Sequence, residues 1–411
     1  MAVVSDARNE RNVLILTGVG HFTAHFFELM FPTLAVTLAA QSGAPLEQVL
    51  GWSFLGYLLF GLGALPAGLL ADRIGARLML IAAIFGLGVA ALAASEAPNG
   101  RALSLCLAVM GLFASVYHPA GTSLITRTIG ARGRALGVNG MFGNVAIAVT
   151  PVVTAALVAR LGWQDTYRMI GYVTCAIAVA CAFLPIDERP TARAVEPVGP
   201  PWARRSMVLF GVLLVAAMLA GVSYRGNTLL LPSYFAARVP EIGFGLATSL
   251  VYLLGIGGQY VGGRLADRHD LSRLYLVFHA LSLPALLLMV VLSGVPLLGG
   301  AAIFVFFSLG MQPIENSLFA QLTPPRWRAT AFGIKFACTF GVGSLAVWLV
   351  QWADVTGGLR LALLCLAGVV ALVVAVAAVF MRMSHRSLAP DTAAARRAAG
   401  ADKAPLVEVG A

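Results

Sequence analysis

Charged residues are scarce in this chain of 411 residues. Asp, Glu, Lys and Arg make up 11% of the sequence, whereas soluble domains carry about 25%. A water-soluble fold of this size could not cover its surface with so few charges, which excludes a cytosolic enzyme, a nucleic-acid-binding protein and a disordered chain. Hydrophobic residues reach 59% and glycines number 44, a combination typical of helices in lipid. The composition therefore predicts a polytopic membrane protein.

Cysteine is also rare, and the motifs of metal, redox and nucleotide sites are missing. The five cysteines lie in apolar stretches and form no C-x-x-C pair, so we expect buried thiols rather than disulfides or a metal site. The P-loop pattern G-x-x-x-x-G-K-[ST] does not occur, which argues against work driven directly by ATP. No cofactor and no resident metal is expected.

Long apolar stretches make up most of the chain. A helix needs about 20 apolar residues to cross a bilayer, and the sequence contains twelve such stretches. They are far too long for the strands of a membrane barrel, so an all-α fold is predicted. The predicted spans are residues 12–39, 47–71, 77–95, 101–126, 134–159, 166–185, 206–232, 243–266, 273–293, 297–321, 329–352 and 359–382.

Basic residues are distributed unevenly between the loops. With the N-terminus inside, 21 of the 28 Lys and Arg residues fall in cytoplasmic segments and 5 in outer loops, so both termini are expected to be cytoplasmic. Residues 186–205 contain four prolines and predict a cytoplasmic linker. It separates an N-terminal six-helix bundle, residues 1–185, from a C-terminal one, residues 206–383. The remaining tail, residues 384–411, is expected to be cytoplasmic and disordered.

The two halves of the sequence repeat each other. Residues 68–73 and 263–268 share the pattern Gly-x-Leu-Ala-Asp-Arg, 195 residues apart. A second match joins the first spans of the halves and places Arg225 opposite His25. The fold class is thus predicted as two pseudo-symmetric bundles related by an axis along the membrane normal.

The run at residues 68–77, with its second copy and the twelve spans, resembles the major facilitator superfamily over essentially the whole chain. This resemblance implies the twelve-helix fold of that family and a gradient-driven transporter, not an enzyme. It also implies that the Asp and Arg side chains of the two loops hold the halves in one state; the alternative is that they merely end a helix at the interface. The predicted gating residues are Gly68, Asp72, Arg73, Gly75, Arg77, Gly263, Asp267 and Arg268.

A narrower resemblance covers about a tenth of the chain. The segment 115–119, Ser-Val-Tyr-His-Pro, followed by Gly133-Arg134 and Gly143-Asn144, is similar to fosmidomycin-resistance-type exporters, and His21 suits that group. The fifth span departs from the antiporter pattern G-N-x-G-x-x-x-G-P, because two of its glycines are replaced. Export is therefore favoured over import through the His-Pro segment alone.

Four formal charges lie inside predicted spans: Glu28, Arg225, Glu315 and Lys335. Each would cost about 2.5–3.5 kcal/mol at the centre of a bilayer, so such residues normally face a cavity or a partner. The four charges sum to zero. We therefore expect them around one central, water-accessible cavity, compensating each other.

Two of these charges have neighbours that suggest roles. His21, His25 and Glu28 share one helical face in the first span, which predicts a proton-coupling site, or else a packed polar stripe. Arg225, with Tyr224 and Asn227 beside it, offers a planar fork suited to an anion, unless it forms a structural ion pair with Glu28 or Glu315.

The remaining polar residues of the spans complete the predicted site. Glu315 and Lys335 could form a pair linked to protonation, with Glu315 as a further proton-coupling residue, or a fixed salt bridge that braces two helices. His118, before a proline, is a candidate for substrate or proton contact. The predicted substrate-binding residues are Arg225, Lys335, His118, Tyr117, Tyr224, Asn227, Gln312, Asn316 and Asn139.

The sequence favours a proton-coupled secondary transporter of a small organic or inorganic anion, or an anionic drug, in the bacterial cytoplasmic membrane. The alternative is a transporter of transition metals or metal chelates that uses His21, His25, Glu28 and His118 as ligands. A receptor or scaffold that has lost transport is a third class. The expected partners are the anionic substrate, protons and membrane lipid, without nucleic acid, and the chain is expected to be a monomer.

Overall fold

The computed structural model describes residues 7–130, 132–189, 202–324 and 327–388. In this part of the chain the secondary structure is helical and contains no strand. The helices are α1 (Ala7–Ser42), α2 (Leu46–Gly51), α3 (Phe54–Leu62), α4 (Ala64–Ile74), α5 (Ala76–Ser95), α6 (Gly100–Ala114), α7 (Tyr117–Thr128), α8 (Arg132–Ala182), α9 (Arg204–Arg238), α10 (Phe244–Ala266), α11 (Leu271–Val291), α12 (Gly294–Leu322), α13 (Arg328–Gly343) and α14 (Ala346–Leu388).

Two helices are too long to cross a bilayer only once. α8 has 51 residues and would measure about 75 Å if straight, more than twice the thickness of a hydrocarbon core. It breaks at Gly162, which has a positive φ of 78°. α14 breaks in the same way at Gly357 and Gly358, where φ of the second glycine is 74°. Both breaks fall between predicted spans.

The number of helices agrees with the predicted spans once these breaks are counted. Within the described residues nine helical stretches are long and apolar enough to span a membrane, or ten if the bent pair formed by 46–62 and 64–74 is one span. Dividing α8 at its glycine, and the stretch 330–385 at its two glycines, turns ten into twelve. The count of twelve crossings and the cytoplasmic side of the termini stay predictions.

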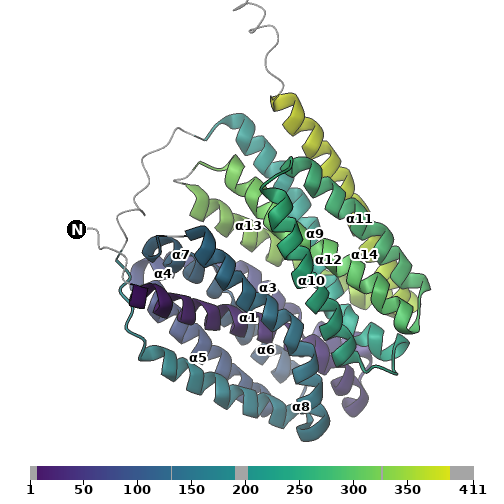
Figure 1. The fold of residues 1–411 in the computed structure, drawn as a ribbon. Coiled ribbons are helices and arrows are strands. Elements are labelled where there is room, and N and C mark those ends of the chain that lie inside the picture. Colours follow the sequence, from purple (N-terminus) through teal and green to yellow (C-terminus); the bar gives the residue numbers. More distant parts are fainter. Residues whose placement is uncertain (1–6, 131, 190–201, 325–326, 389–411) are drawn as a thin grey trace, which may run out of the picture.

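The helices form two adjacent groups that follow the order of the chain (Figure 1). In the first half α8 packs on α1 and α5, and α3 packs on α6. In the second half α9 packs on α13 and α14, and α12 packs on α10 and α11. The halves meet where α1 contacts α9, α3 contacts α13 and α8 contacts α10. The division into two bundles stays a prediction; residues 190–201 of the linker and 389–411 of the tail lie outside the described residues, and α14 continues to Leu388.

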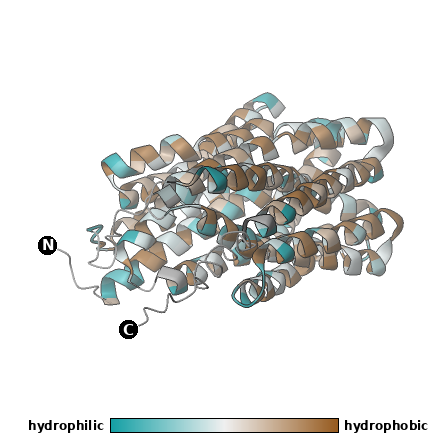
Figure 2. Cartoon of the chain, turned by 90° about the horizontal axis from the view of Figure 1, so that it is seen from above, coloured by the Kyte–Doolittle hydropathy of each residue, from teal (hydrophilic) through white to brown (hydrophobic). Residues whose placement is uncertain are grey.

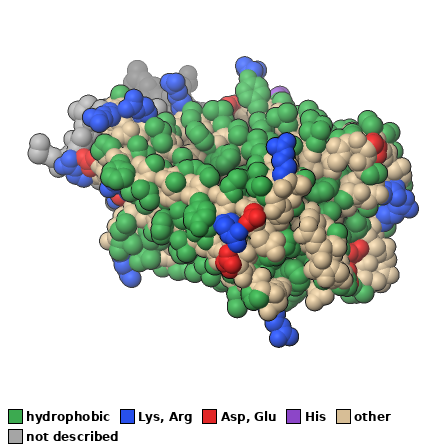
Figure 3. Space-filling model, turned by 90° about the horizontal axis from the view of Figure 1, so that it is seen from below, with side chains coloured by type: hydrophobic (Ala, Val, Ile, Leu, Met, Phe, Trp, Pro, Cys, Tyr) green, Lys and Arg blue, Asp and Glu red, His purple; other side chains and the backbone are tan. Residues whose placement is uncertain are grey.

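Apolar side chains cover the outside of the molecule. Large hydrophobic residues such as Phe183, Val291 and Tyr260 are 82%, 70% and 66% exposed. Hydrophobic residues run along the helices and hydrophilic ones gather toward their ends (Figure 2). On the face seen in Figure 3, Lys and Arg occur in a few separate groups on a largely hydrophobic surface. An apolar surface of this extent is stable only in contact with lipid.

Glycines let helices pack closely in both halves. A Cβ atom on Gly111 would lie 1.9 Å from the carbonyl oxygen of Gly56, and one on Gly262 would lie 1.9 Å from that of Gly310. In the two repeated loop motifs, Gly68 faces Pro119 and Gly263 faces Pro313, where an added Cβ would lie 3.2 Å and 3.9 Å from the proline Cβ. This equivalent packing supports the internal repeat.

Candidate substrate and proton site

A buried ion pair joins the two halves near the middle of the molecule. Arg225 Nη2 on α9 lies 2.7 Å from Glu28 Oε1 on α1, and both side chains are only 1% exposed. Two charges removed from water to this degree are costly unless each compensates the other. Both residues were predicted as site residues from the sequence. A structural ion pair with Glu28 was the alternative to an anion-binding role for Arg225.

Two neighbours hold this ion pair in position. His25 Nδ1 lies 2.5 Å from Glu28 Oε2, one helical turn away on the same face of α1. The Tyr57 ring from α3 lies against the guanidinium, with its centre 3.8 Å from Arg225 Cζ. Its hydroxyl donates to the backbone carbonyl oxygen of Glu28 at 3.1 Å. Tyr57 was not among the predicted site residues, because a tyrosine in an apolar span is equally typical of packing.

Arg225 keeps unused hydrogen-bonding capacity. Its Nε and Nη1 atoms are buried and make no hydrogen bond to the described residues, while Nη2 faces Glu28 Oε1. A buried guanidinium with free N–H groups is suited to a planar anion that can accept two of them.

Three histidine rings gather beside this pair. The ring centres of His21 and His25 are 5.0 Å apart, and the His118 ring lies 5.7 Å and 5.6 Å from them. His118 also stacks on Phe336 and Phe340 of α13, with ring centres 4.9 Å and 5.5 Å away. The histidines of the first half therefore touch the second half through His118.

Asn139 links two further predicted residues. Its backbone oxygen lies 2.9 Å from His21 Nδ1, and its side-chain oxygen accepts a hydrogen bond from the Tyr117 hydroxyl. Tyr117 in turn stacks on His21, with ring centres 4.3 Å apart. These bonds fix the orientation of the imidazole ring of His21.

The other two buried charges form a separate pair within the second half. Lys335 Nζ on α13 lies 2.8 Å from Glu315 Oε1 on α12, and both side chains are 6% exposed. Lys335 also donates to Asn316 Oδ1 at 2.5 Å, and the Tyr275 hydroxyl donates to Glu315 Oε2 at 3.0 Å. The four charges thus compensate each other in two pairs, and their arrangement around one cavity stays a prediction.

Gln312 belongs to a chain of amides between the halves. Gln259 Nε2 on α10 donates to Gln312 Oε1 at 2.8 Å, and Asn144 on α8 donates to Gln259 Oε1. Gln259 was missed by sequence reasoning because a lone amide in a span carries no pattern. Such bonds between helices in lipid each contribute about 0.6 kcal/mol.

Tyr224 and Asn227 lie close to Arg225 on α9. The Tyr224 ring centre is 5.9 Å from Arg225 Cζ. Asn227 is buried and uses its Nδ2 to donate to the Ser223 carbonyl at 2.8 Å. Its Oδ1 has no partner among the described residues.

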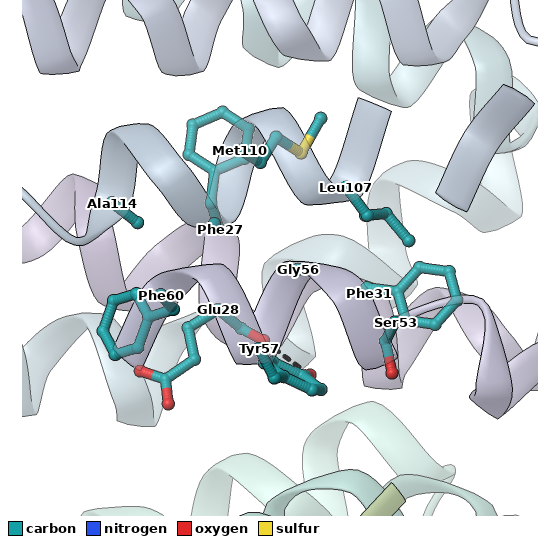
Figure 4. A pocket seen from close by; sticks show the side chains of 11 residues that line it. Phe27, Glu28, Phe31, Ser53, Gly56, Tyr57, Phe60, Leu107, Met110 and Ala114 are labelled. Atoms are coloured by element: carbon teal, nitrogen blue, oxygen red, sulfur yellow. Dashed lines mark hydrogen bonds between the residues drawn. The ribbon is translucent and has the colours of Figure 1, made fainter. Parts of the chain in front are cut away.

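A small pocket adjoins the Glu28 end of the ion pair. Glu28, Ser53 and Tyr57 line it together with apolar side chains, and Figure 4 shows Phe27 and Met110 on the side opposite Tyr57. Its volume is about 40 Å³, space for a few water molecules and too small for an organic substrate. An organic molecule could enter this pocket only if the helices around it separated.

The predicted gating residues lie at the ends of α4, α5 and α10. Asp72 lies 3.9 Å from Arg127 of the same half, with both side chains well exposed. Gly75, with φ of 97°, starts the turn into α5, and Arg77 donates from Nη2 to the Ala182 carbonyl. Arg73, Asp267 and Arg268 are exposed and make no ion pair with a described residue. No ion pair or side-chain hydrogen bond of these residues therefore bridges the halves within the described part of the chain.

One contact near this end was not predicted from the sequence. The Glu188 carboxylate accepts hydrogen bonds from the backbone N–H groups of Ala76 and Arg77 at 2.9 Å and 3.0 Å, which caps α5. The start of the predicted linker is thereby held against the first half.

The family of the protein follows from its sequence and its fold together. The sequence model described as Major Facilitator Superfamily matches residues 17–345, and also residues 213–409. The chain belongs to the major facilitator superfamily. This family consists of transporters, not enzymes, and membership confirms an all-helical fold of major facilitator type and a multi-pass protein of the cell membrane.

Individual relatives match part of the chain. The puromycin resistance protein pur8 of Streptomyces alboniger is 30% identical over 244 residues, 49% of this chain and 48% of that protein. The probable L-galactonate transporter of Escherichia coli (strain K12) is 28% identical over 236 residues, 51% of each chain. The matches thus span about half the length of these relatives.

A solved structure matches nearly the whole chain. It is the inward-facing, unoccupied form of a bacterial homologue of the human lysosomal transporter Spinster, with a TM-score of 0.73 over 92% of this chain and 98% of that one. At 13% sequence identity this likeness shows the fold alone.

Proposed function

We propose that this major facilitator protein is a proton-coupled secondary transporter of a small organic anion. The observation that carries the proposal is the buried ion pair between Glu28 and Arg225, in which the guanidinium retains N–H groups without an acceptor. An organic anion is also what the name of one relative, the L-galactonate transporter, describes.

Competition for Arg225 would couple the anion to the proton. While Glu28 is ionised, its carboxylate occupies the guanidinium at 2.7 Å. A proton on Glu28 removes this attraction, so that a substrate carboxylate can take its place beside Arg225. His25, within 2.5 Å of Glu28, is placed to exchange that proton, and His21 and His118 extend the path. Proton and anion therefore favour each other's binding.

The direction of coupling follows from this competition. If the proton and the anion bind together, they cross the membrane together, and an inward proton gradient drives uptake. Export was favoured only through the resemblance of the segment around His118. The competition at Arg225 supports symport, and hence uptake, as the direction to test first.

The pair of Glu315 and Lys335 has a different role in this proposal. It lies within one half, and Tyr275 and Asn316 make further hydrogen bonds to it. The pair therefore fits a fixed salt bridge that braces two helices better than a substrate site. For the metal alternative, the described residues offer no group of three or more His, Cys, Asp or Glu side chains placed to hold a metal ion. The geometry therefore supports an anion over a metal.

The test is substrate-triggered proton movement in proteoliposomes that contain the full chain and an internal pH dye. A panel of carboxylates and phosphonates is added outside, with Zn²⁺ as the probe of the metal alternative. Wild-type protein should carry protons together with at least one anion. Glu28→Gln should abolish proton movement, and Arg225→Lys should weaken the response because it keeps the charge but loses the planar fork.

Glu315→Gln is the matched control, since it removes the charge of the other buried glutamate. The folded fraction of this variant should still couple proton movement to the anion. Anion uptake without proton movement in the wild type would contradict the coupling. A response to Zn²⁺ alone would replace the anion with a metal.

A further inference from the structure

A second cavity on α9 is lined by polar groups that lack partners. Tyr224, Asn227, Tyr252 and Ser308 line it, together with apolar residues of α9, α10 and α12. Asn227 is 3% exposed and Tyr252 is 2% exposed. The Asn227 Oδ1 and Tyr252 hydroxyl atoms make no hydrogen bond to any described residue. Buried polar atoms without partners are uncommon and costly, so two of them around one cavity point to a ligand.

The chemistry of the two groups is complementary. The Asn227 amide has its orientation fixed, because Nδ2 donates to the Ser223 carbonyl at 2.8 Å and to Ser223 Oγ at 3.5 Å. Oδ1 is therefore left as an acceptor only. The Tyr252 hydroxyl can donate. A group that donates one hydrogen bond and accepts another satisfies both, which is the property of an alcohol.

The cavity lies next to the proposed anion site. The Tyr224 ring lines it and also lies 5.9 Å from Arg225 Cζ. The cavity volume is about 10 Å³, enough for one water-sized group such as a hydroxyl. A carboxylate at Arg225 would bring its own hydroxyl groups toward this cavity.

We propose that Asn227 and Tyr252 form a hydroxyl-recognition subsite, so that the transported anion is a hydroxylated carboxylate. The inference rests on the proposed role of Arg225 as the anion site. In the absence of substrate a water molecule serves the same two groups, and the substrate hydroxyl replaces it on binding.

The test compares carboxylates that differ only in hydroxyl groups. Proton movement in proteoliposomes is measured with lactate against propionate and with gluconate against hexanoate, for wild type, Tyr252→Phe and Asn227→Leu. The wild type should prefer the hydroxylated member of at least one pair by about tenfold or more, as two net hydrogen bonds allow. Both variants should lose this preference, because their response to the hydroxylated member should weaken more than their response to the other member.

Tyr234→Phe provides the matched control. Tyr234 is as deeply buried in the same half, but its hydroxyl already donates to the Met289 carbonyl at 2.8 Å. This variant should lower the melting temperature and leave the preference intact. If Tyr252→Phe behaves in the same way, the two groups hold a structural water and the inference is wrong.

Failure of the inference is distinguishable from failure of the proposed function. Equal responses to both members of each pair in the wild type would overturn the subsite while leaving anion transport standing. If no carboxylate moves protons, or if Arg225→Ala responds like wild type, the anion site itself is wrong and the subsite falls with it. Should Tyr252→Phe fail to fold, Asn227→Leu alone decides.

Discussion

The two buried ion pairs have nearly the same length but join different parts of the molecule. Arg225 and Glu28 are 2.7 Å apart and connect α9 to α1, helices from different halves of the chain. Lys335 and Glu315 are 2.8 Å apart and connect α13 to α12, which follow each other in the second half.

This difference indicates which ion pair would be affected when the two halves move during transport. In alternating access the halves move against each other around a site between them. Glu28 and Arg225 lie on opposite sides of the interface that such a motion would change, whereas Lys335 and Glu315 lie on one side of it. Breaking a buried pair leaves uncompensated charges, so a proton or an anion has to be present at the first pair when it opens.

The largest effect is expected from Arg225→Ala. The variant removes the proposed anion-binding fork and leaves Glu28 buried without its partner. Anion-driven proton movement should therefore fall at least about 100-fold, as expected for the loss of a buried charge partner worth roughly 3–5 kcal/mol. Initial rates in proteoliposomes measure it. Addition of Glu28→Gln should restore folding but not transport; restored transport would show that Arg225 serves only to neutralise Glu28.

The second pair should respond in the opposite way. Lys335→Met alone should destabilise the protein by about 3–5 kcal/mol, because it strands the Glu315 carboxylate. The double variant with Glu315→Gln should recover most of that stability, because Gln can still accept from Tyr275, and it should transport. Thermal unfolding in detergent and transport rates give both quantities. A stable double variant without transport would move Lys335 back into the substrate site.

Glycines at the interface between the halves offer a smaller perturbation. A Cβ atom on Gly61 of α3 would lie 2.2 Å from the backbone nitrogen of Gly341 on α13. Gly61→Ala should therefore disfavour this closed interface by about 1–3 kcal/mol without unfolding either half. Spin-label distances between α3 and α13 should lengthen. Gly257→Ala, with no atom within 4 Å of its added Cβ, should leave them unchanged.

The smallest change in stability is expected at the exposed pair of Asp72 and Arg127. Their separation of 3.9 Å and their exposure limit the contribution to less than about 1 kcal/mol. Asp72→Asn should thus leave the melting temperature nearly unchanged, and a role in gating would appear only as an altered transport rate. Glu96→Gln is the control at the other end of the helices, where Arg168 hydrogen-bonds Glu96 and holds the pKa of that carboxyl below its ordinary value. A rate that is unchanged in both variants would contradict the gating role.

The fold was largely predictable because lipid imposes a simple rule. Apolar runs of about 20 residues must be helices, and the glycine breaks within α8 and α14 fall where the sequence already lost its apolar character. The charges in the spans were equally conspicuous, since an ionisable residue in lipid requires a partner.

The pairing of those charges was harder to predict. Periodicity places residues on a helix face but does not say which helices face each other, so Glu28 could have paired with Lys335 as well as with Arg225. Tyr57, Gln259 and Glu188 were missed for a related reason. Each acts through contacts between segments far apart in the sequence, and none carries a local pattern.

The affinity of the purified protein for its anion, measured against pH, tests the competition at Arg225 most directly. If Glu28 must take up a proton before the anion binds, affinity in the wild type should fall about tenfold per pH unit over the range in which Glu28 ionises. Glu28→Gln, which is permanently neutral, should bind with an affinity that no longer changes over this range, while Glu315→Gln should follow the wild type. Unchanged pH dependence in Glu28→Gln would contradict the account.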